Sequence, residues 1–435
     1  MDFNRLRAIL LQARIPLLAS LLPPEMECFL VGGALRDWQL NRPVSDFDFA
    51  VSGDPTELAQ SFAAAVGGHW FMLDPERRQS RVVTRQQDAP SFNYDFAPFR
   101  ADDLIGDLQL RDFTINAVAL PVVTGNELPA LIDPLGGISH LKSGFLRGCS
   151  PGVFQDDPLR ILKGVRHSAS LGLSVEPRTL IWMREAADLL PRVAAERVRS
   201  ELSGVFAADD AVRGMLLLRE LGLLELLFGP DCRAVRFEQG LDRLERAGAV
   251  VDYLLSVDRP LWLNGNLEEG VSRRALLKMA AFLSGLQLSN AQEFFSAWRF
   301  GRNTTRIGAS LAGLSPQRFN ELTNLACSRR GRALWSADLG PGPCEHLAFL
   351  PVLVELPVDL AVGQVLPFLD DVRATLRDGR IPDLVDGDWV RNELGLSGME
   401  IGKVLQSLRI AEIEGRVWIV ETAREFLRNG GRLDG

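Results

Sequence analysis

Two aspartates, Asp46 and Asp48, stand one residue apart in residues 45–51 (SDFDFAV). The alternation of polar and apolar residues predicts a β-strand, in which residues i and i+2 share one face. Their Cα atoms should then lie about 6–7 Å apart. Two carboxylates at this separation suit one or two hard cations such as Mg²⁺, which prefers oxygen ligands and substrate phosphates.

A glycine turn precedes the two aspartates. Residues 29–31 predict a short apolar strand, Gly32 and Gly33 a turn, and residues 34–37 the start of a helix. Glycines there let backbone N–H groups approach a triphosphate at a helix start, where the helix dipole favours anions. Alone, an Asp-x-Asp is most often a solvated strand face and a Gly-Gly a plain turn. Together, in the order strand, turn, helix and strand, they predict a site for nucleotidyl transfer.

The segment from Gly32 to Arg42, followed by Asp46-Phe47-Asp48, resembles the signature of class II tRNA nucleotidyltransferases and bacterial poly(A) polymerases. That family belongs to the DNA polymerase beta superfamily. Further blocks resemble the later family motifs in the right order: residues 111–117 (RDFTINA), 133–137 (DPLGG), 156–163 (DDPLRILK) and 196–202 (ERVRSEL). Five ordered blocks in the first half of the chain make coincidence implausible.

The resemblance implies a template-independent enzyme that adds C and/or A from CTP or ATP to the 3′ end of tRNA and releases pyrophosphate. Asp46 and Asp48 are then catalytic and hold Mg²⁺, the expected cofactor. The expected nucleotide-binding residues are Gly32, Gly33, Arg36, Arg111, Asp112, Asn116, Asp157, Arg160, Lys163 and Arg166.

Asp157 and Arg160 are three residues apart on a predicted helix, so they share a face. Cytosine and adenine each place an amino donor beside a ring-nitrogen acceptor, and an Asp acceptor next to an Arg donor matches both. Uracil and guanine present the opposite pattern and would leave a buried charge unpaired. The pair is therefore expected to select C or A, and the alternative is an ordinary surface ion pair.

Four positions differ from the usual family pattern. Leu110 is found where the family often has an arginine, and His140 where it often has Asp. Asp156 replaces the usual Glu, and Lys163 replaces a common Arg. Leu110 leaves one triphosphate contact missing or supplied elsewhere. His140 lies beside residues 133–137, where the resemblance implies a hinge between head and neck. Lys is not equivalent to Arg at a planar, bidentate site.

Two further residues have an open interpretation. Asp95, on the strand predicted at 92–97, is either a third carboxylate near the metal or a solvent-facing strand residue. Arg100 faces either the incoming nucleotide and primer or plain solvent.

The product is also open: complete CCA addition, CC addition, A addition and poly(A) synthesis share these motifs. Residues 66–74 (VGGHWFMLD) lack the basic segment that poly(A) polymerases of the family tend to carry there, which favours tRNA end synthesis. The short connection from Arg100 to Asp107 favours a partial activity, CC or A addition alone.

Two alternative functions come from other classes: a small-molecule nucleotidyltransferase and a non-catalytic RNA-binding relative. Residues 157–160 and the long helical half disfavour the first, and the intact aspartates disfavour the second.

Composition fits a large globular protein: 435 residues, 46% hydrophobic and 24% charged. Apolar runs such as residues 215–227 are too short and too often interrupted by charges to span a membrane, so no membrane partner is expected. Five cysteines without a pattern predict reduced thiols and a cytoplasmic protein. The net charge of −8 disfavours RNA binding, but binding depends on local patches, and arginine clusters occur at 197–199, 273–274 and 327–332. The oligomeric state is open.

The order of patterns predicts an α+β head, a mixed sheet with helices, followed by an all-α neck, body and tail. The expected divisions are a catalytic head at 1–125, a base-recognising neck at 126–206, a helical body at 207–350 and a helical, tRNA-binding tail at 351–435.

Overall fold

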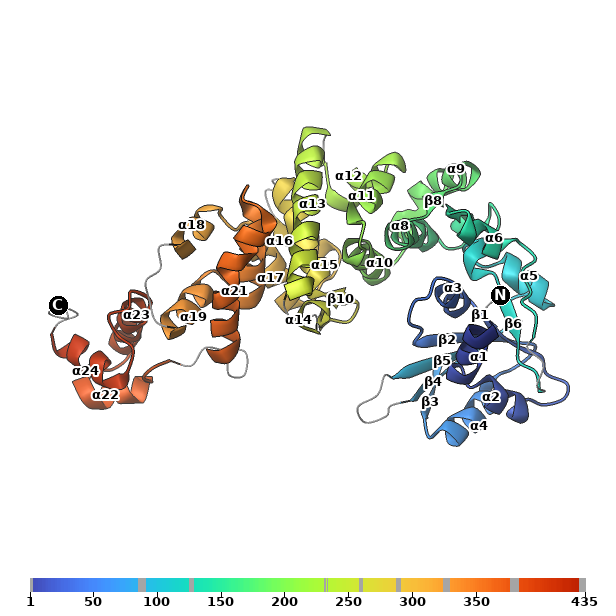
Figure 1. Cartoon of the computed structure of the whole chain (residues 1–435), viewed down its shortest axis with the longest axis horizontal. Helices are drawn as coiled ribbons and strands as arrows, with labels where there is room; N and C mark the ends of the chain where they lie inside the picture. Colours follow the sequence, from blue (N-terminus) through green and yellow to red (C-terminus); the bar gives the residue numbers. More distant parts are fainter. Residues whose placement is uncertain are drawn as a thin grey trace. The chain divides into compact units, whose positions relative to one another are not determined.

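The computed structural model describes residues 3–84, 91–124, 129–230, 232, 234–257, 261–286, 291–323, 329–375 and 383–429. They form two compact units, Met1–Val193 and Ala194–Gly435 (Figure 1). The expected division into head, neck, body and tail is finer than this and stays a prediction.

In the first unit, the described residues form a six-stranded sheet in the order β3-β4-β5-β2-β1-β6. Its strands are β1 (Cys28–Val31), β2 (Asp46–Val51), β3 (His69–Asp74), β4 (Gln79–Thr84), β5 (Phe92–Pro98) and β6 (Ala119–Pro121). Strands β2 and β5 are parallel, and the other neighbours are antiparallel. The mixed sheet expected for the head is therefore confirmed.

One face of this sheet is packed by helices (Figure 1). These are α1 (Phe3–Gln12), α2 (Ile15–Leu21) and α4 (Thr56–Val66). Phe47 and Phe49 on β2 are buried against them, as are Tyr94 and Phe96 on β5. Since successive strand residues point to opposite faces, Asp46 and Asp48 lie on the other face.

The opposite face is only partly covered. Helix α5 (Leu104–Gln109) packs against β1 and β6 through Leu104 and Leu108. The side chain of Asp103 caps α5 by accepting the backbone N–H of Gly106 at 2.7 Å. The helix thus covers the β1–β6 side of this face, next to the strand that carries the two aspartates.

The rest of the first unit is mostly helical. Its elements are α3 (Gly33–Gln39), η1 (Thr114–Asn116), α6 (Gly137–Lys142), β7 (Phe145–Leu146), α7 (Val153–Asp156), α8 (Leu159–Leu171), β8 (Ser174–Val175), α9 (Pro177–Glu185) and η2 (Ala187–Arg192). Strands β7 and β8 pair in parallel, a small ribbon within a region expected to be wholly helical. Helix α3 follows β1 directly, as the glycine turn predicted.

The described residues of the second unit form helices and one short antiparallel ribbon. The elements are α10 (Ala195–Ala207), α11 (Ala211–Glu220), α12 (Leu224–Phe228), α13 (Ala234–Val257), α14 (Leu261–Asn264), β9 (Asn266–Glu268), β10 (Val271–Ser272), α15 (Arg273–Gly285), α16 (Ala291–Ala297), α17 (Arg302–Ala312), α18 (Gln317–Thr323), α19 (Arg329–Asp338), α20 (Pro343–Phe349), η3 (Leu350–Leu353), α21 (Val358–Thr375), α22 (Gly387–Leu394), α23 (Met399–Ile413) and α24 (Val420–Arg428). Helix α15 is buried along most of its length. In the described part of the chain, no helix combines the length and apolarity that a membrane span requires.

Candidate active site

The two aspartates lie on the partly covered face of the sheet, next to polar residues of β5. Asp46 pairs with Asn93 and Asp48 with Asp95 in the parallel register. The carboxylate of Asp46 accepts hydrogen bonds from Asn93 Nδ2 at 2.7 Å and from Ser45 Oγ at 2.6 Å. These two donors fix the orientation of Asp46 on the strand.

Gly32, Asp48 and Arg111 come together from three separate segments. Gly32 has φ of +80°, a conformation that favours glycine. A Cβ at this position would lie 2.9 Å from Asp48 Oδ2 and 3.6 Å from Arg111 Nη1. The glycine turn, the carboxylate and the guanidinium expected from the sequence therefore line one site.

Both carboxylates and cations act on Asp48. The side chain of Asp48 reaches solvent at the surface of the sheet, but protein atoms surround it on the other sides. The resulting desolvation is the main cause that raises the pKa of Asp48, and the charge of Asp95 raises it further. Arg111 and Lys163 act in the opposite direction. A bound cation would relieve this cost of ionising Asp48.

Asp95 is held by a neighbouring arginine. The Arg81 guanidinium donates from Nε and Nη2 to its two carboxylate oxygens, both at 2.6 Å. Asp95 thus lies directly beside Asp48 but already has a bidentate partner. Its role as a third metal carboxylate stays a prediction.

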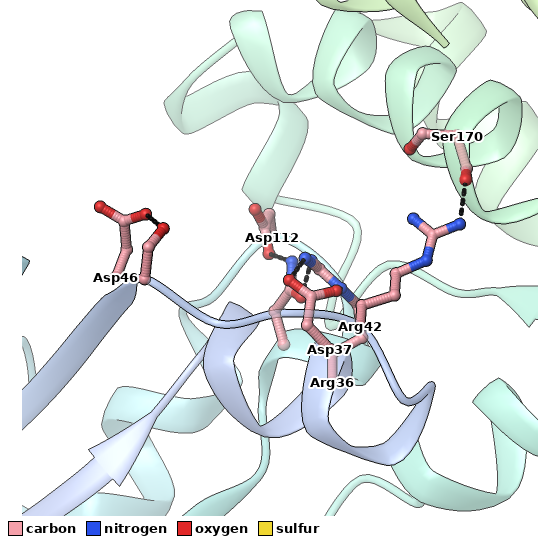
Figure 2. A network of polar contacts seen from close by, with 8 residues as sticks. Arg36, Asp37, Arg42, Asp46, Asp112 and Ser170 are labelled. Carbon is pink, nitrogen blue, oxygen red and sulfur yellow. Dashed lines mark hydrogen bonds and ion pairs between the residues drawn. The ribbon is translucent and has the colours of Figure 1, made fainter. Parts of the chain in front are cut away.

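A continuous polar network links three of the sequence blocks. Figure 2 shows the part of it around Arg36, Asp37 and Asp112. Arg36 on α3 pairs with Asp37 through two contacts of 3.0 and 2.7 Å and donates from Nη1 to Asn116 Oδ1 at 2.8 Å. Asn116 Nδ2 then donates to Asp112 at 3.0 Å, and Lys163 Nζ lies 2.5 Å from Asp112 Oδ2. The network ties the glycine-turn helix to η1 and to α8.

Asp112 is the buried centre of this network. Burial alone would raise its pKa, but the Lys163 ammonium, with His167 and the Asn116 amide, lowers it well below the usual range. Asp112 also accepts the backbone N–H of Phe113 at 2.7 Å. A buried carboxylate with these partners positions other groups, because its lone pairs are directed at protein donors.

Residues at intervals of three line one side of α8 and the turn before it. The predicted base-reading and nucleotide-binding residues there are Asp157, Arg160, Lys163 and Arg166, all partly exposed. Asp157 accepts the backbone N–H of Leu159 at 3.3 Å, and Arg160 Nη1 donates to the Val153 carbonyl at 3.2 Å. Asp157 itself precedes α8 in an extended conformation, so the helical face expected for Asp157 and Arg160 is not formed as predicted. Base selection by the two residues stays a prediction.

Sequence reasoning missed Asp107. This residue, 1% exposed, accepts Arg111 Nη2 at 2.8 Å and the backbone N–H of Arg100 at 3.2 Å. Burial is the main cause that lowers the pKa of Arg100, and Arg111 and Arg160 lower it further. Arg100 Nε lies 3.7 Å from Asp107, and a contact of Arg100 with the incoming nucleotide or the primer stays a prediction. The spacing of Asp107 and Arg111, four residues apart, was the available signal.

The segment expected to be a hinge is tightly connected in the structure. The Asp133 carboxylate accepts the backbone N–H groups of Gly137 at 2.7 Å and Ile138 at 2.9 Å, which caps α6. His140 Nδ1 and Thr114 Oγ1 are hydrogen-bonded at 3.0 Å, so α6 is fixed to η1. His140, which occupies the position of the usual Asp, thus joins α6 to η1 through its hydrogen bond with Thr114.

The arginine clusters proposed to bind RNA have carboxylate partners in the second unit. Nε of Arg273 lies 2.8 Å from Glu345. In the same way, Nε of Arg329 lies 2.7 Å from Asp371. Residues 327 and 328 of the last cluster lie outside the described part. RNA binding by these clusters stays a prediction.

The donor set of Asp46 and Asp48 fits Mg²⁺. Among the described residues, no group of three or more His, Cys, Asp or Glu side chains stands together as a metal site. Mg²⁺ needs fewer, since one or two carboxylates commonly hold it while waters and substrate phosphates complete the octahedron. The four described cysteines, Cys28, Cys149, Cys232 and Cys344, are free thiols, in agreement with the expectation from sequence.

Known protein families and relatives match this chain over most of its length. Residues 28–147 match the family described as "Poly A polymerase head domain" and residues 172–235 "Probable RNA and SrmB- binding site of polymerase A". The chain is 32% identical to a CC-adding tRNA nucleotidyltransferase of Geobacter sulfurreducens, over 92% of this chain and 91% of the relative. It is 33% identical to an A-adding tRNA nucleotidyltransferase of Deinococcus radiodurans, over 92% and 94%.

Solved structures share the fold. A CCA-adding enzyme in complex with ATP superposes with a TM-score of 0.68 at 20% identity, covering 98% of this chain and 95% of that one. A Thermotoga maritima CCA-adding enzyme complexed with tRNA gives a TM-score of 0.64 at 20% identity, with the same coverage.

Proposed function

The chain belongs to the class II tRNA nucleotidyltransferase family, and from this premise we propose that Asp46 and Asp48 carry the transfer of C or A to the 3′ end of tRNA. The enzyme takes CTP, ATP or both and releases pyrophosphate. The observation that carries the proposal is the convergence of Gly32, Asp48 and Arg111 at one point of the sheet.

Asp46 and Asp48 are the residues that would hold the divalent metal used throughout this family, and Mg²⁺ is the ion we propose. When bound, Mg²⁺ supplies positive charge that stabilises the attacking and leaving oxygens of an in-line displacement. Asn93 and Ser45 hold Asp46 in place through their hydrogen bonds. The open solvent exposure of both aspartates leaves room for the RNA 3′-hydroxyl and the α-phosphate.

The triphosphate lies against the glycine turn in this proposal. Gly32 and Gly33 let the backbone approach the phosphate oxygens closely. Arg36 uses three of its five N–H donors for Asp37 and Asn116, and we assign the others to a phosphate. Asp107 holds Arg111 so that its Nη1 faces the site. Binding and orientation by fixed donors is how phosphoryl-type transfer is accelerated.

In this proposal, side chains of α8 and of the turn before it select the base of the incoming nucleotide. Asp157 accepts from the amino group of cytosine or adenine, and Arg160 donates to the neighbouring ring nitrogen. Asp112 and Asn116 are positioning residues, because they join Lys163 on α8 to Arg36 on α3. Arg166 lies one turn after Lys163 and extends the same side of the helix.

Primer extension tests the proposal and assigns the product. The substrates are tRNA transcripts that end before the tail, after C and after CC, together with an unstructured RNA, each with Mg²⁺ and one labelled nucleotide. Strict stopping after C, CC or CCA on tRNA is the expected result and identifies the subtype. A long A tract on the unstructured RNA would make the enzyme a poly(A) polymerase, and no incorporation on any RNA would contradict the proposal. The cytoplasmic location stays a prediction.

A further inference from the structure

Strand β3 presents large apolar side chains to solvent. It forms one edge of the sheet in the described part of the chain, and Phe71 and Leu73 are 43% and 44% exposed, with His69 also exposed. The alternate residues Trp70 and Met72 are partly buried, and Trp70 packs against the main core. Edge strands usually carry charges on their solvated face. Packing among the described residues of the first unit leaves this surface exposed.

The exposed residues of β3 share a face with the catalytic carboxylates. The registers place Phe71 opposite Arg81, Arg81 opposite Asp95, and Asp95 opposite Asp48. Residues directly opposite one another in a sheet project from the same face. Neighbouring strands lie about 4.8 Å apart, so the Cα atoms of Phe71 and Asp48 are separated by about 14 Å along this row. The exposed apolar surface of β3 therefore lies on the same face of the sheet as Asp48, separated from it by Arg81 and Asp95.

The chemistry of the surface suits flat, weakly polar rings. His69 lies opposite Val83, so an imidazole and an aliphatic side chain flank the phenyl ring of Phe71. Between this surface and Asp48, the charges of Arg81 and Asp95 are paired with each other. The turn after β3 adds the well-exposed Arg77 and Arg78, which lie 3.8 Å from Asp74 and 3.5 Å from Asp54, respectively, and retain exposed guanidinium groups that suit phosphates. Bases stacking on aromatic side chains, with arginines near the backbone, are typical of proteins that bind single-stranded RNA.

We propose that His69, Phe71 and Leu73 form a stacking platform for the unpaired bases of the RNA that precede its 3′-terminal nucleotide. The proposal rests on the proposed function, because it requires the RNA 3′-hydroxyl to lie in front of Asp46 and Asp48. The distance along the strand row places the platform beyond the terminal nucleotide, so it contacts primer RNA and leaves the incoming nucleotide to other residues.

The test compares Phe71→Ala, Phe71→Trp and the control Ile181→Ala, a similarly exposed apolar residue on α9. Steady-state kinetics with the full-length enzyme measure KM for a tRNA primer and, separately, KM for the nucleotide. Loss of one stacked base is expected to raise the primer KM of Phe71→Ala about tenfold. The nucleotide KM stays unchanged, and Phe71→Trp and Ile181→Ala behave like the wild type.

A second series uses primers with a single abasic site at successive positions upstream of the 3′ end. One abasic primer is expected to raise the KM of the wild type about as much as Phe71→Ala does, with no further rise when the two changes are combined. Such non-additivity identifies the stacked base, and a merely structural role of Phe71 would not produce it.

The outcomes separate this proposal from the proposed function. An active wild type whose primer KM is unaffected by Phe71→Ala would overturn the platform alone, as would additive effects with every abasic primer. The platform would equally be overturned if Phe71→Ala changed only self-association in sedimentation, since the surface would then contact a second copy of the chain. A wild type that extends no RNA at all would refute the proposed function itself.

Discussion

At the scale of single residues, the two carboxylates of β2 are kept exposed by the same alternation that buries Phe47 and Phe49. A strand needs one apolar face to pack, so a polar residue at every second position costs little stability. Asp48 nevertheless lies where protein and Asp95 raise its pKa. A carboxylate whose ionisation is disfavoured in this way fits a role in binding cations, because a bound cation favours the ionised form.

Asp46→Asn and Asp48→Asn are each expected to lower kcat by about 100-fold or more, the scale of losing one charge-stabilising group. Affinity for tRNA should change little, because RNA binding rests on other contacts. Single-turnover extension and equilibrium RNA binding measure the two quantities. Asp188→Asn, an exposed carboxylate of η2, serves as the matched control and should retain full activity. An active Asp48→Asn enzyme would contradict the metal-holding role.

Arg160→Lys keeps the charge on α8 but removes the planar fork of donors. The ratio of correct to incorrect nucleotides, CTP or ATP against UTP or GTP, should fall about 10- to 100-fold, because a lost buried contact costs about 1–3 kcal/mol. Incorporation of each nucleotide on the same tRNA primer gives this ratio. Arg178→Lys on α9, where the arginine lies over Trp182, is the control. Unchanged discrimination would place base selection elsewhere.

At the scale of elements, the connection between η1 and α6 depends on close backbone approach. A Cβ on Gly137 would collide with the carbonyl oxygen of Thr114. Gly137→Ala is therefore expected to destabilise the protein by about 1–3 kcal/mol, the usual cost of overpacking. Gly152→Ala is the control, because Gly152 has an ordinary helical φ of −67° and open space around it. Urea unfolding of both variants measures the difference, and equal stability of the two would show that the backbone can relax.

Asp112 gives the network between α3, η1 and α8 a definite pH dependence. Its pKa is lower in the folded protein than the ordinary value of about 3.9, so its ionised form stabilises the fold above that pH. This contribution is lost as the pH falls below about 4 toward the lowered pKa. Asp112→Asn should thus be less stable than wild type at pH 7, by a gap that is constant down to about pH 5 and narrows below about pH 4. Urea unfolding across this range measures the gap, and one that widened on acidification would contradict the assignment.

Elements whose pattern is local were predictable from the sequence, and contacts between distant segments were not. The strand at β2 and the glycine turn before α3 follow from alternation and from glycine itself. The ribbon of β7 and β8 escaped prediction because two-residue strands carry no periodicity. Asp107 was missed although it stands four residues before Arg111, because its burial and its contact with the backbone N–H of Arg100 arise only in the fold. The bidentate pairing of Arg81 with Asp95 likewise depends on strand register.

At the scale of the whole molecule, a net charge of −8 must be reconciled with binding a polyanion. Internal ion pairs, such as those of the buried carboxylates Asp107, Asp112 and Asp371, remove one charge of each sign and leave the total unchanged. Local arginines, and not the total, then set RNA affinity.

Unit Ala194–Gly435, which contains no residue of the proposed catalytic site, is expected to contribute phosphate contacts away from the acceptor end. The Asp46→Asn protein should then bind full-length tRNA with a steeper salt dependence than an acceptor-stem minihelix. The reason is that the slope of log K against log salt grows with the number of phosphates neutralised. Equilibrium binding between about 50 and about 200 mM salt gives both slopes. Equal slopes would mean that the enzyme grips only the acceptor end, and the helical second unit would then need a role other than holding RNA.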